Sequence, residues 1–331
     1  MAYTTIDDPS GIFTANLYSG NATNGTTIST GHTNDLIWTK GRAGTYGGRG
    51  LRIIDSVRGA TKVLYGDQDL AEGTNNSSSG VTGFASTSYT IGGDADFNGS
   101  GTTYVSWTWK IQAGVCDIQT YTGNGSARTI SHNLGAVPTM MIIKKRNTAA
   151  PWSVGHASLG ANQVLELNET DAVATDATYW NNTRPTSSVF TVGTDGNQNT
   201  NTHTYLIYLF GNKQGVSRMG KYIGNGNADG TFVYTGFKPA FVMQKSTTTT
   251  YGWQIYDNKR GGFNPENDEL VANLDSAETD GSGNGFPDFY SNGFKLRNTD
   301  INKNASGVTY IYMAFAENPF VTSTGVPATA R

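Results

Sequence analysis

Three copies of one sequence pattern run through the chain, and this repetition limits its fold more than any other feature. A Tyr-x-Gly-Asn phrase begins at Tyr18, Tyr121 and Tyr222, so successive copies are 103 and 101 residues apart. Each phrase is followed by an apolar segment ending in lysine and then by a turn ending in glycine. These landmarks are residues 36–40, 140–144 and 241–245, and then residues 55–59, 156–160 and 257–261. Landmarks that recur in order at a nearly constant spacing predict tandem structural units.

Each copy closes with an aromatic-rich segment that begins at Tyr104, Tyr205 or Tyr310. In the first copy, alternation places Val105, Trp107 and Trp109 on one face. The matched positions are Leu206, Tyr208 and Phe210 in the second copy, and Ile311, Met313 and Phe315 in the third. Because side chains alternate between the faces of a strand, this pattern predicts strands with one buried face.

The composition agrees with short strands joined by many turns. The chain has 42 glycines and 17 tyrosines together with runs of Thr, Ser and Asn, while long amphipathic helical segments are absent. Glycine and asparagine suit turns, whereas threonine and tyrosine suit a pleated surface. We therefore expect an all-β protein of three tandem β-sandwich units, jelly-roll-like, each of about 100 residues.

The repeat spacing also gives expected boundaries. These are an N-terminal arm (residues 1–9), units at 10–114, 115–216 and 217–320, and a C-terminal tail (321–331). Short connectors around residues 112–116 and 213–217 predict a compact or curved body with three lobes. Whether the units pack in a row or as an internal trimer stays open at this point. The arm and the tail lack a core pattern and are expected to dock onto other proteins.

Three segments carry a resemblance to a known family: residues 2–10, residues 55–60 and residues 129–138 with the apolar segment after them. They resemble a tandem-repeat family found in structural and tail-fibre genes of marine bacteriophages, including cyanophages. The resemblance covers essentially the whole chain. It implies a virion component, such as a tail-fibre, tail-tip or head-decoration protein, and it supplies no catalytic residues. The second copy has His156 and Leu159 where the other turns have Asp and Arg, which argues against a shared active site.

Charge and hydropathy remove several classes of protein. The 23 basic and 26 acidic residues are spread along the chain, so we expect no nucleic-acid groove, which needs clustered Lys and Arg. No segment approaches the roughly 18 to 20 apolar residues of a membrane-spanning helix. The N-terminus resembles no secretory signal, so synthesis in the host cytoplasm and assembly into the virion are expected. Cys116 is the single cysteine and forms no internal disulfide.

One loop has the oxygen-rich pattern of a calcium site. Asp94, Asp96 and Asn98 alternate before a glycine, but the twelfth position is Val105 instead of the bidentate Glu that such loops use. A hairpin rich in Asn and Gly is therefore the favoured interpretation, with calcium as the alternative. Residues 280–288 have the same ambiguity. No other cofactor is expected.

Five aromatic residues beside polar loops are candidates for ligand binding: Trp152, Tyr179, Trp180, Tyr251 and Trp253. Aromatic faces serve as platforms for sugar rings or partner surfaces. Alternatively, they cap the ends of the sandwiches. Trp152 and Trp253 are 101 residues apart, and this equivalence favours a core role for the pair. Tyr179 and Trp180 have no counterpart and are the preferred surface residues.

The leading functional hypothesis is a non-enzymatic virion structural protein that mediates assembly contacts and adheres to the host surface. Its expected partners are other virion proteins and a host surface glycan, and a homo-oligomer is possible. A triplicated chain could also occupy a threefold position of the particle. The alternative is a glycan depolymerase acting on host surface polysaccharide. That reaction needs two carboxylates at a defined separation, and the sequence pairs none.

Overall fold

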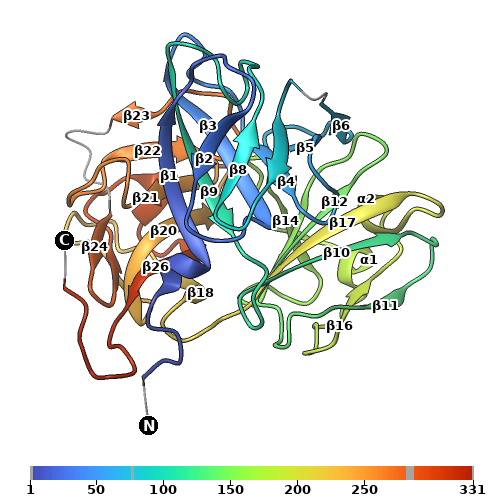
Figure 1. Ribbon diagram of the computed structural model, residues 1–331. Coiled ribbons are helices and arrows are strands. Elements are labelled where there is room, and N and C mark those ends of the chain that lie inside the picture. Colours follow the sequence, from blue (N-terminus) through green and yellow to red (C-terminus); the bar gives the residue numbers. More distant parts are fainter. Residues whose placement is uncertain (1–2, 76–77, 281–286, 330–331) are drawn as a thin grey trace.

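Three units of the same architecture form the molecule. Its structure is a computed structural model that describes residues 3–75, 78–280 and 287–329. Strands account for 42% of the chain and helices for 5%, which confirms the all-β expectation. Each unit has a six-stranded antiparallel sheet and a smaller sheet of two or three strands. The units occupy three separate parts of the ribbon (Figure 1). Among the described residues, no helix has the length and apolar character needed to cross a membrane.

The strands of each unit come from one stretch of the chain. The first unit contains β1 (Phe13–Ser19), β2 (Thr26–Ser29), β3 (Leu36–Gly44), β4 (Arg52–Asp55), β5 (Lys62–Tyr65), β6 (Gly73–Thr74), β7 (Val81–Phe84), β8 (Ser88–Ile91) and β9 (Thr102–Trp109), preceded by a 3-10 turn at Pro9–Gly11. The second unit contains β10 (Cys116–Thr122), β11 (Arg128–Ser131), β12 (Met140–Lys145), β13 (Ser153–His156), β14 (Gln163–Glu166), β15 (Ala174–Thr175), α1 (Ala177–Trp180), β16 (Val189–Val192), α2 (Gly196–Asn199) and β17 (Thr204–Phe210).

The third unit repeats this order. It contains β18 (Ser217–Ile223), β19 (Phe232–Tyr234), β20 (Phe237–Ser246), β21 (Gln254–Asp257), β22 (Asp268–Val271), β23 (Thr279–Asp280), β24 (Asp288–Tyr290), β25 (Gly293–Lys295), α3 (Ile301–Asn304) and β26 (Thr309–Pro319). The large sheets have the orders β1-β9-β3-β4-β5-β6, β10-β17-β12-β13-β14-β15 and β18-β26-β20-β21-β22-β23. The first and last long strands of every unit are therefore neighbours at one edge of its large sheet.

Three contacts explain the Tyr-x-Gly-Asn phrase, which joins the first long strand of a unit to its last long strand and to the loop before that strand. In the first unit the rings of Tyr18 and Tyr104 stack with centroids 5.2 Å apart. A Cβ on Gly20 would come within 2.2 Å of a backbone oxygen, so only glycine fits. The backbone N–H of Asn21 donates to Oδ1 of Asn98 at 3.0 Å. Equivalent stacks join Tyr121 to Tyr205 and Tyr222 to Tyr310.

The closing strands are buried on both faces, so the expectation of one buried face is wrong. Val105, Trp107 and Trp109 of β9 belong to a core cluster that all three units share. Tyr104, on the opposite face, is also fully buried. These strands lie between their own sandwich on one side and the neighbouring units on the other. The alternating positions therefore fill one common interior instead of three separate ones.

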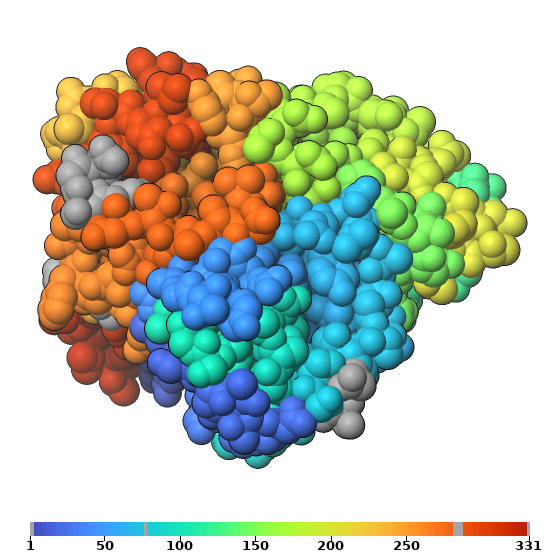
Figure 2. Space-filling view, turned by 90° about the horizontal axis from the view of Figure 1, so that it is seen from above, coloured from blue at the N-terminus to red at the C-terminus, as the bar shows by residue number. Residues whose placement is uncertain are grey.

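The three units form a closed ring around this shared core. Trp109, Phe210 and Phe315 occupy the same position in the three units, and all three rings meet. Their centroids are 6.2, 5.5 and 6.0 Å apart for the pairs Trp109–Phe210, Trp109–Phe315 and Phe210–Phe315. Three equivalent residues can all touch one another only near a threefold axis. The space-filling view shows the three units meeting around one point (Figure 2).

Three equivalent buried lysines, Lys40, Lys144 and Lys245, join each unit to the next. Each Nζ donates to a backbone carbonyl of a neighbouring unit: Lys40 to Leu274 at 2.5 Å, Lys144 to Asp69 at 2.8 Å and Lys245 to Thr170 at 3.0 Å. The first unit thus contacts the third, the second contacts the first and the third contacts the second. This cyclic order resolves the alternative between a row and an internal trimer in favour of the trimer.

The described parts of both chain ends pack against the ring. Tyr3 donates its hydroxyl to the carbonyl of Gly236 at 2.7 Å, and Thr4 Oγ1 donates to the carbonyl of Gln214 at 3.1 Å. Asp7 accepts a hydrogen bond of 2.6 Å from the backbone N–H of Ser323. The arm and the tail therefore hold each other beside the third unit, and their docking onto other virion proteins stays a prediction.

Candidate functional site

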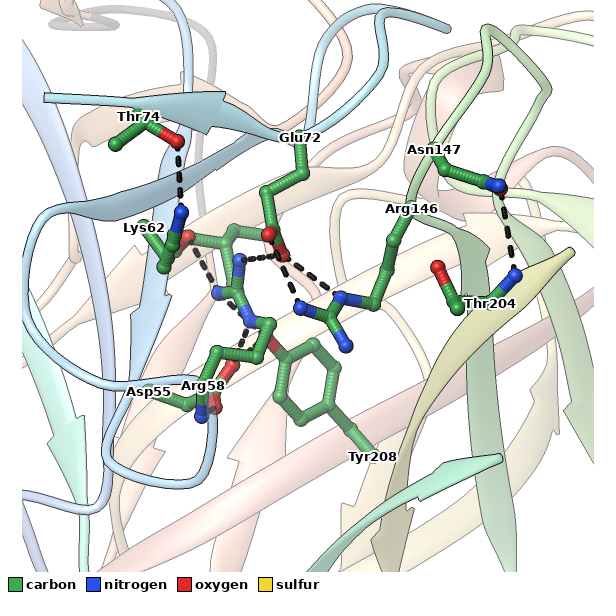
Figure 3. Close-up of polar contacts among 10 residues, drawn as sticks. Asp55, Arg58, Lys62, Glu72, Thr74, Arg146, Asn147, Thr204 and Tyr208 are labelled. Carbon is green, nitrogen blue, oxygen red and sulfur yellow. Dashed lines mark hydrogen bonds and ion pairs between the residues drawn. The ribbon is translucent and has the colours of Figure 1, made fainter. Parts of the chain in front are cut away.

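The turn after β4 forms a buried charged network between the first and second units (Figure 3). Arg58 Nε lies 2.5 Å from Asp55 Oδ2, and both side chains are fully buried. Tyr208, from β17 of the second unit, donates its hydroxyl to Asp55 at 2.8 Å. Arg58 also reaches Glu72 at 3.2 Å, and Arg146 of the second unit contacts Glu72 at 2.8 Å. Although burial raises the pKa of Glu72, the arginines lower it further, so its carboxylate stays charged.

The turn after β21 repeats this network between the third and first units. Arg260 Nε lies 2.6 Å from Asp257 Oδ2, and the indole N–H of Trp107 donates to the same carboxylate at 2.9 Å. Arg260 continues to Glu278 at 3.1 Å, which pairs with Arg42 of the first unit at 2.7 Å. Each carboxylate of these two networks has partners from two units, so the charges are compensated across the interface.

Among the residues that the structure describes, the turn after β13 forms no such network at the interface between the second and third units. His156 and Leu159 replace the Asp and Arg of the other turns. His156 Nδ1 accepts the backbone N–H of Ser158 at 3.1 Å, and Nε2 faces the carbonyl of Tyr312 at 3.4 Å. Burial lowers the pKa of His156 to about 4, so the imidazole is neutral at pH 7. The three units therefore share one strand arrangement, but only two of the three interfaces contain the buried Asp–Arg pair.

A pocket of about 200 Å³ opens beside this uncharged turn. Its walls are mostly apolar, with Val137, Pro138, Met141, Ala157, Trp180 and Pro185, and its polar lining includes His156, Gln163 and Arg184. Drug-sized ligands usually occupy pockets of about 300 to 1,000 Å³. The smaller volume fits one ring or one large side chain.

The back wall of the pocket is fixed by α1 and β13. Asp176 caps the short helix by accepting the backbone N–H of Thr178 at 2.8 Å. Trp180, at the end of the helix, donates its indole N–H to the carbonyl of Gln163 at 3.0 Å. A Cβ on Gly155 of β13 would lie 2.9 Å from the Trp180 ring, so glycine allows the close contact. Arg184 donates to the carbonyl of Leu159.

The five aromatic residues predicted as ligand contacts have different environments. Trp152 and Trp253 are buried and donate their indole N–H groups to carbonyls of the preceding unit, Tyr65 at 2.8 Å and Glu166 at 2.9 Å. This bears out the core role that their spacing favoured.

The expectation that Tyr179 and Trp180 are surface residues is wrong. They are 8% and 3% exposed, because α1 packs them into the core of the second unit. Trp180 nevertheless lines the pocket, whereas Tyr251 is partly exposed just before β21. The pocket residues Met141 and Arg184 were not predicted from the sequence. Two sequence signals showed that this part of the second unit differs: Trp180 has no counterpart, and His156 and Leu159 replace the Asp and Arg of the other turns.

The predicted calcium residues each have separate structural partners. Asp94 accepts the backbone N–H of Gly80 at 2.6 Å, and Asp96 pairs with Arg52 at 3.0 Å. The Asn98 amide clamps the Tyr-x-Gly-Asn phrase, as Asn199 and Asn304 do in the other units. Over residues 3–75, 78–280 and 287–329, no group of three His, Cys, Asp or Glu side chains could hold a metal ion. Calcium binding stays a prediction, and most of the second candidate stretch, 280–288, lies outside the described residues.

Comparison with known proteins identifies the family. A family model described as Domain of unknown function (DUF7483) matches residues 8–319, so the chain belongs to this family. The match extends over all three units of the ring. No curated protein matches the chain.

Proposed function

We propose that this DUF7483 protein is a non-enzymatic structural component of a bacteriophage particle, placed at a threefold position of the tail or head. The sequence resemblance to phage structural and tail-fibre proteins supports the setting. The observation that carries the proposal is the closed ring, in which Trp109, Phe210 and Phe315 meet at the axis. Such a ring presents three similar faces to neighbours that are themselves related by threefold symmetry.

Fusion of three units in one chain has two physical advantages for such a component. The ring cannot dissociate on dilution, whereas a trimer of separate chains depends on protomer concentration. The units can also differ in sequence, so that one lobe acquires a contact that the others lack. The pocket beside His156 is an example, because the matched turns of the other units carry charged networks.

The pocket fits an assembly contact. An apolar side chain of a neighbouring virion protein, aromatic or aliphatic, would fill about 200 Å³ and contact Met141 and Trp180. Aromatic side chains that insert into well-packed pockets dominate the binding energy of many protein interfaces. Arg184 and Gln163 at the wall would orient that side chain through its polar atoms or its backbone.

Electron cryomicroscopy of purified particles tests the proposal. We expect density for the ring on a threefold axis. Absence of the protein from purified particles, or a position away from such axes, would refute the structural role.

The pocket is tested with Ala157→Trp, which fills it from an exposed position. This variant should reduce incorporation into particles assembled from a variant-encoding phage. Ala127→Trp, at an exposed site of the same unit outside the pocket lining, is the matched control. Equal incorporation of both variants would eliminate the pocket as the assembly contact.

A further inference from the structure

The outer face of the small sheet in the third unit carries an exposed aromatic cluster. This sheet has the strand order β19-β25-β24. On β19, Phe232 and Tyr234 point outward with 44% and 50% of their surfaces exposed, and Val233 between them is buried. Tyr290 of β24 lies beside Phe232 on the same face, with ring centroids 6.1 Å apart.

The two other units show that the fold does not require aromatic residues at these positions. The inward-facing residues Ile28, Ile130 and Val233 are equivalent, because each pairs with a buried aromatic residue of the neighbouring strand. The exposed positions that flank them are Thr27 and Ser29 in the first unit, Thr129 and Ser131 in the second, and Phe232 and Tyr234 in the third. Small hydroxyl residues therefore suffice for this sheet face in the two other units. In the third unit the hydroxyl of Tyr234 lies 3.1 Å from the hydroxyl of Tyr3 in the N-terminal arm, but about half of the surfaces of Phe232 and Tyr234 stay open to solvent.

The strand register places the aromatic rings next to fixed polar groups. Gly293 of β25 is opposite Tyr234 on one side and Tyr290 on the other, and Lys295 is opposite both Phe232 and Asp288. Because Gly293 has no side chain, the aromatic rings of the two outer strands remain uncovered. The face thus combines exposed ring surfaces with charged groups along one edge.

The charged groups at this edge neutralise one another. Lys295 lies 2.5 Å from Asp229, and Arg297 lies 3.2 Å from Asp288 and 3.7 Å from Asp229. Two cations and two carboxylates leave no net charge, so the face does not select for a charged ligand. Instead it offers fixed donors and acceptors beside apolar rings, which suits a molecule with hydroxyl groups around a C–H-rich face.

We propose that this aromatic face, formed by Phe232, Tyr234 and Tyr290 with Lys295 and Asp288, binds a neutral sugar ring of a polysaccharide. The sugar stacks on the aromatic rings, and its hydroxyl groups bond to the paired charged side chains. Sugar binding is inferred from the residues of this face alone. Its role in host attachment rests on the proposed virion function.

An oligosaccharide array tests this proposal with the full-length protein. The array carries neutral hexose, deoxyhexose and N-acetylhexosamine oligosaccharides together with uronate-containing ones. We expect the wild-type protein to bind at least one neutral oligosaccharide. The double variant F232T/Y234S, which copies the residues of the other units, should bind it about tenfold more weakly or not at all. Ala127→Trp, distant in sequence and on another unit, should bind as the wild type does.

Several results would overturn the proposal. They are no binding of any neutral oligosaccharide, selective binding of uronates, or unchanged binding by F232T/Y234S at an unchanged melting temperature. A change of oligomeric state in the double variant would instead identify the face as a contact between two copies of the chain. Particle analysis separates this test from the virion proposal: a protein present in particles but inactive on the array refutes only the sugar site.

Discussion

Replacing Arg58 by leucine tests how the first interface of the ring is stabilised. The guanidinium contacts Asp55 at 2.5 Å, Glu72 at 3.2 Å and the carbonyl of Ile53 at 3.1 Å. Loss of these contacts leaves the buried Asp55 carboxylate with the Tyr208 hydroxyl and the backbone N–H of residue 58. Breaking a buried ion pair from one side costs about 3 to 5 kcal/mol. Glu72 retains Arg146, so no second charge is stranded.

The chain itself provides the compensating variant. The second unit forms the same turn with His156 and Leu159, so Asp55→His combined with Arg58→Leu removes the stranded carboxylate. Tyr208 then loses its acceptor, which costs about 1 to 3 kcal/mol. The double variant should therefore be more stable than Arg58→Leu alone, although it retains fewer interactions.

Urea unfolding followed by tryptophan fluorescence measures these differences by linear extrapolation. Arg49→Leu is the control, because Arg49 is 43% exposed and its contact with Asp96 spans 3.5 Å. An exposed pair of this kind contributes about 0 to 1 kcal/mol. The reasoning is refuted if the free energy of unfolding of Arg58→Leu lies within about 1 kcal/mol of that of the control, which is the largest effect expected of an exposed pair. It is also refuted if the double variant is no more stable than Arg58→Leu.

Four further predictions concern the ring as a whole. Because the pKa of His156 is about 4 in the folded protein, the free energy of unfolding should fall by up to about 3 kcal/mol as the pH drops from 6.5 to 4, and His156→Asn should flatten this decline in acid titrations. Burial lowers the pKa of Lys40, Lys144 and Lys245 to about 8, so stability should rise from pH 8 towards 10, less so in the triple methionine variant; a flat wild-type profile would contradict this. Phe315→Ala should destabilise the protein by about 3 to 5 kcal/mol in one cooperative transition, since the axis belongs to all three units; a separate early transition would argue against a shared core. A chelator should leave the melting temperature unchanged, because Asp94 is bonded to the backbone N–H of Gly80, and a decrease would support calcium binding in this loop.

The repeated landmarks predicted the strands well because each landmark has a local role. The Tyr-x-Gly-Asn phrase and the closing strand meet within one unit, so their spacing alone reveals equivalent positions. A further landmark with the same role was missed: Asp94, Asp195 and Asp300 each accept the backbone N–H two residues later. Recognition of this repeat would have assigned the calcium-like loop to turn formation.

The ring could not be derived from the repeats, because spacing identifies equivalent residues without showing what they contact. Period-two alternation indicated one buried face, since the other face of β9 contains Ser106 and Thr108. These residues are buried nevertheless, and Thr108 pairs with the hydroxyl of Thr14 at 3.0 Å. A buried polar residue such as Thr108, whose hydroxyl bonds within the unit, looks like a solvent-facing residue in the sequence.

The candidate sites were the least predictable feature. Burial of Trp180 depends on α1, a helix of one turn that no periodic pattern indicates. The outward position of Phe232 and Tyr234 follows from strand alternation, but only comparison with the threonines and serines of the sister units makes their exposure unusual. Both the pocket and the exposed aromatic face lie where the sequence of one unit differs from the sequences of the other two.

The meeting of Trp109, Phe210 and Phe315 at the axis also constrains how the gene can change. Each of these residues has the two equivalent residues of the other units as its neighbours. An enlargement in one copy has to be matched by a reduction in another, because the space between the three is fixed. A second indole, at Phe210 or Phe315, would therefore overfill the space at the axis unless Trp109 were replaced by a smaller residue.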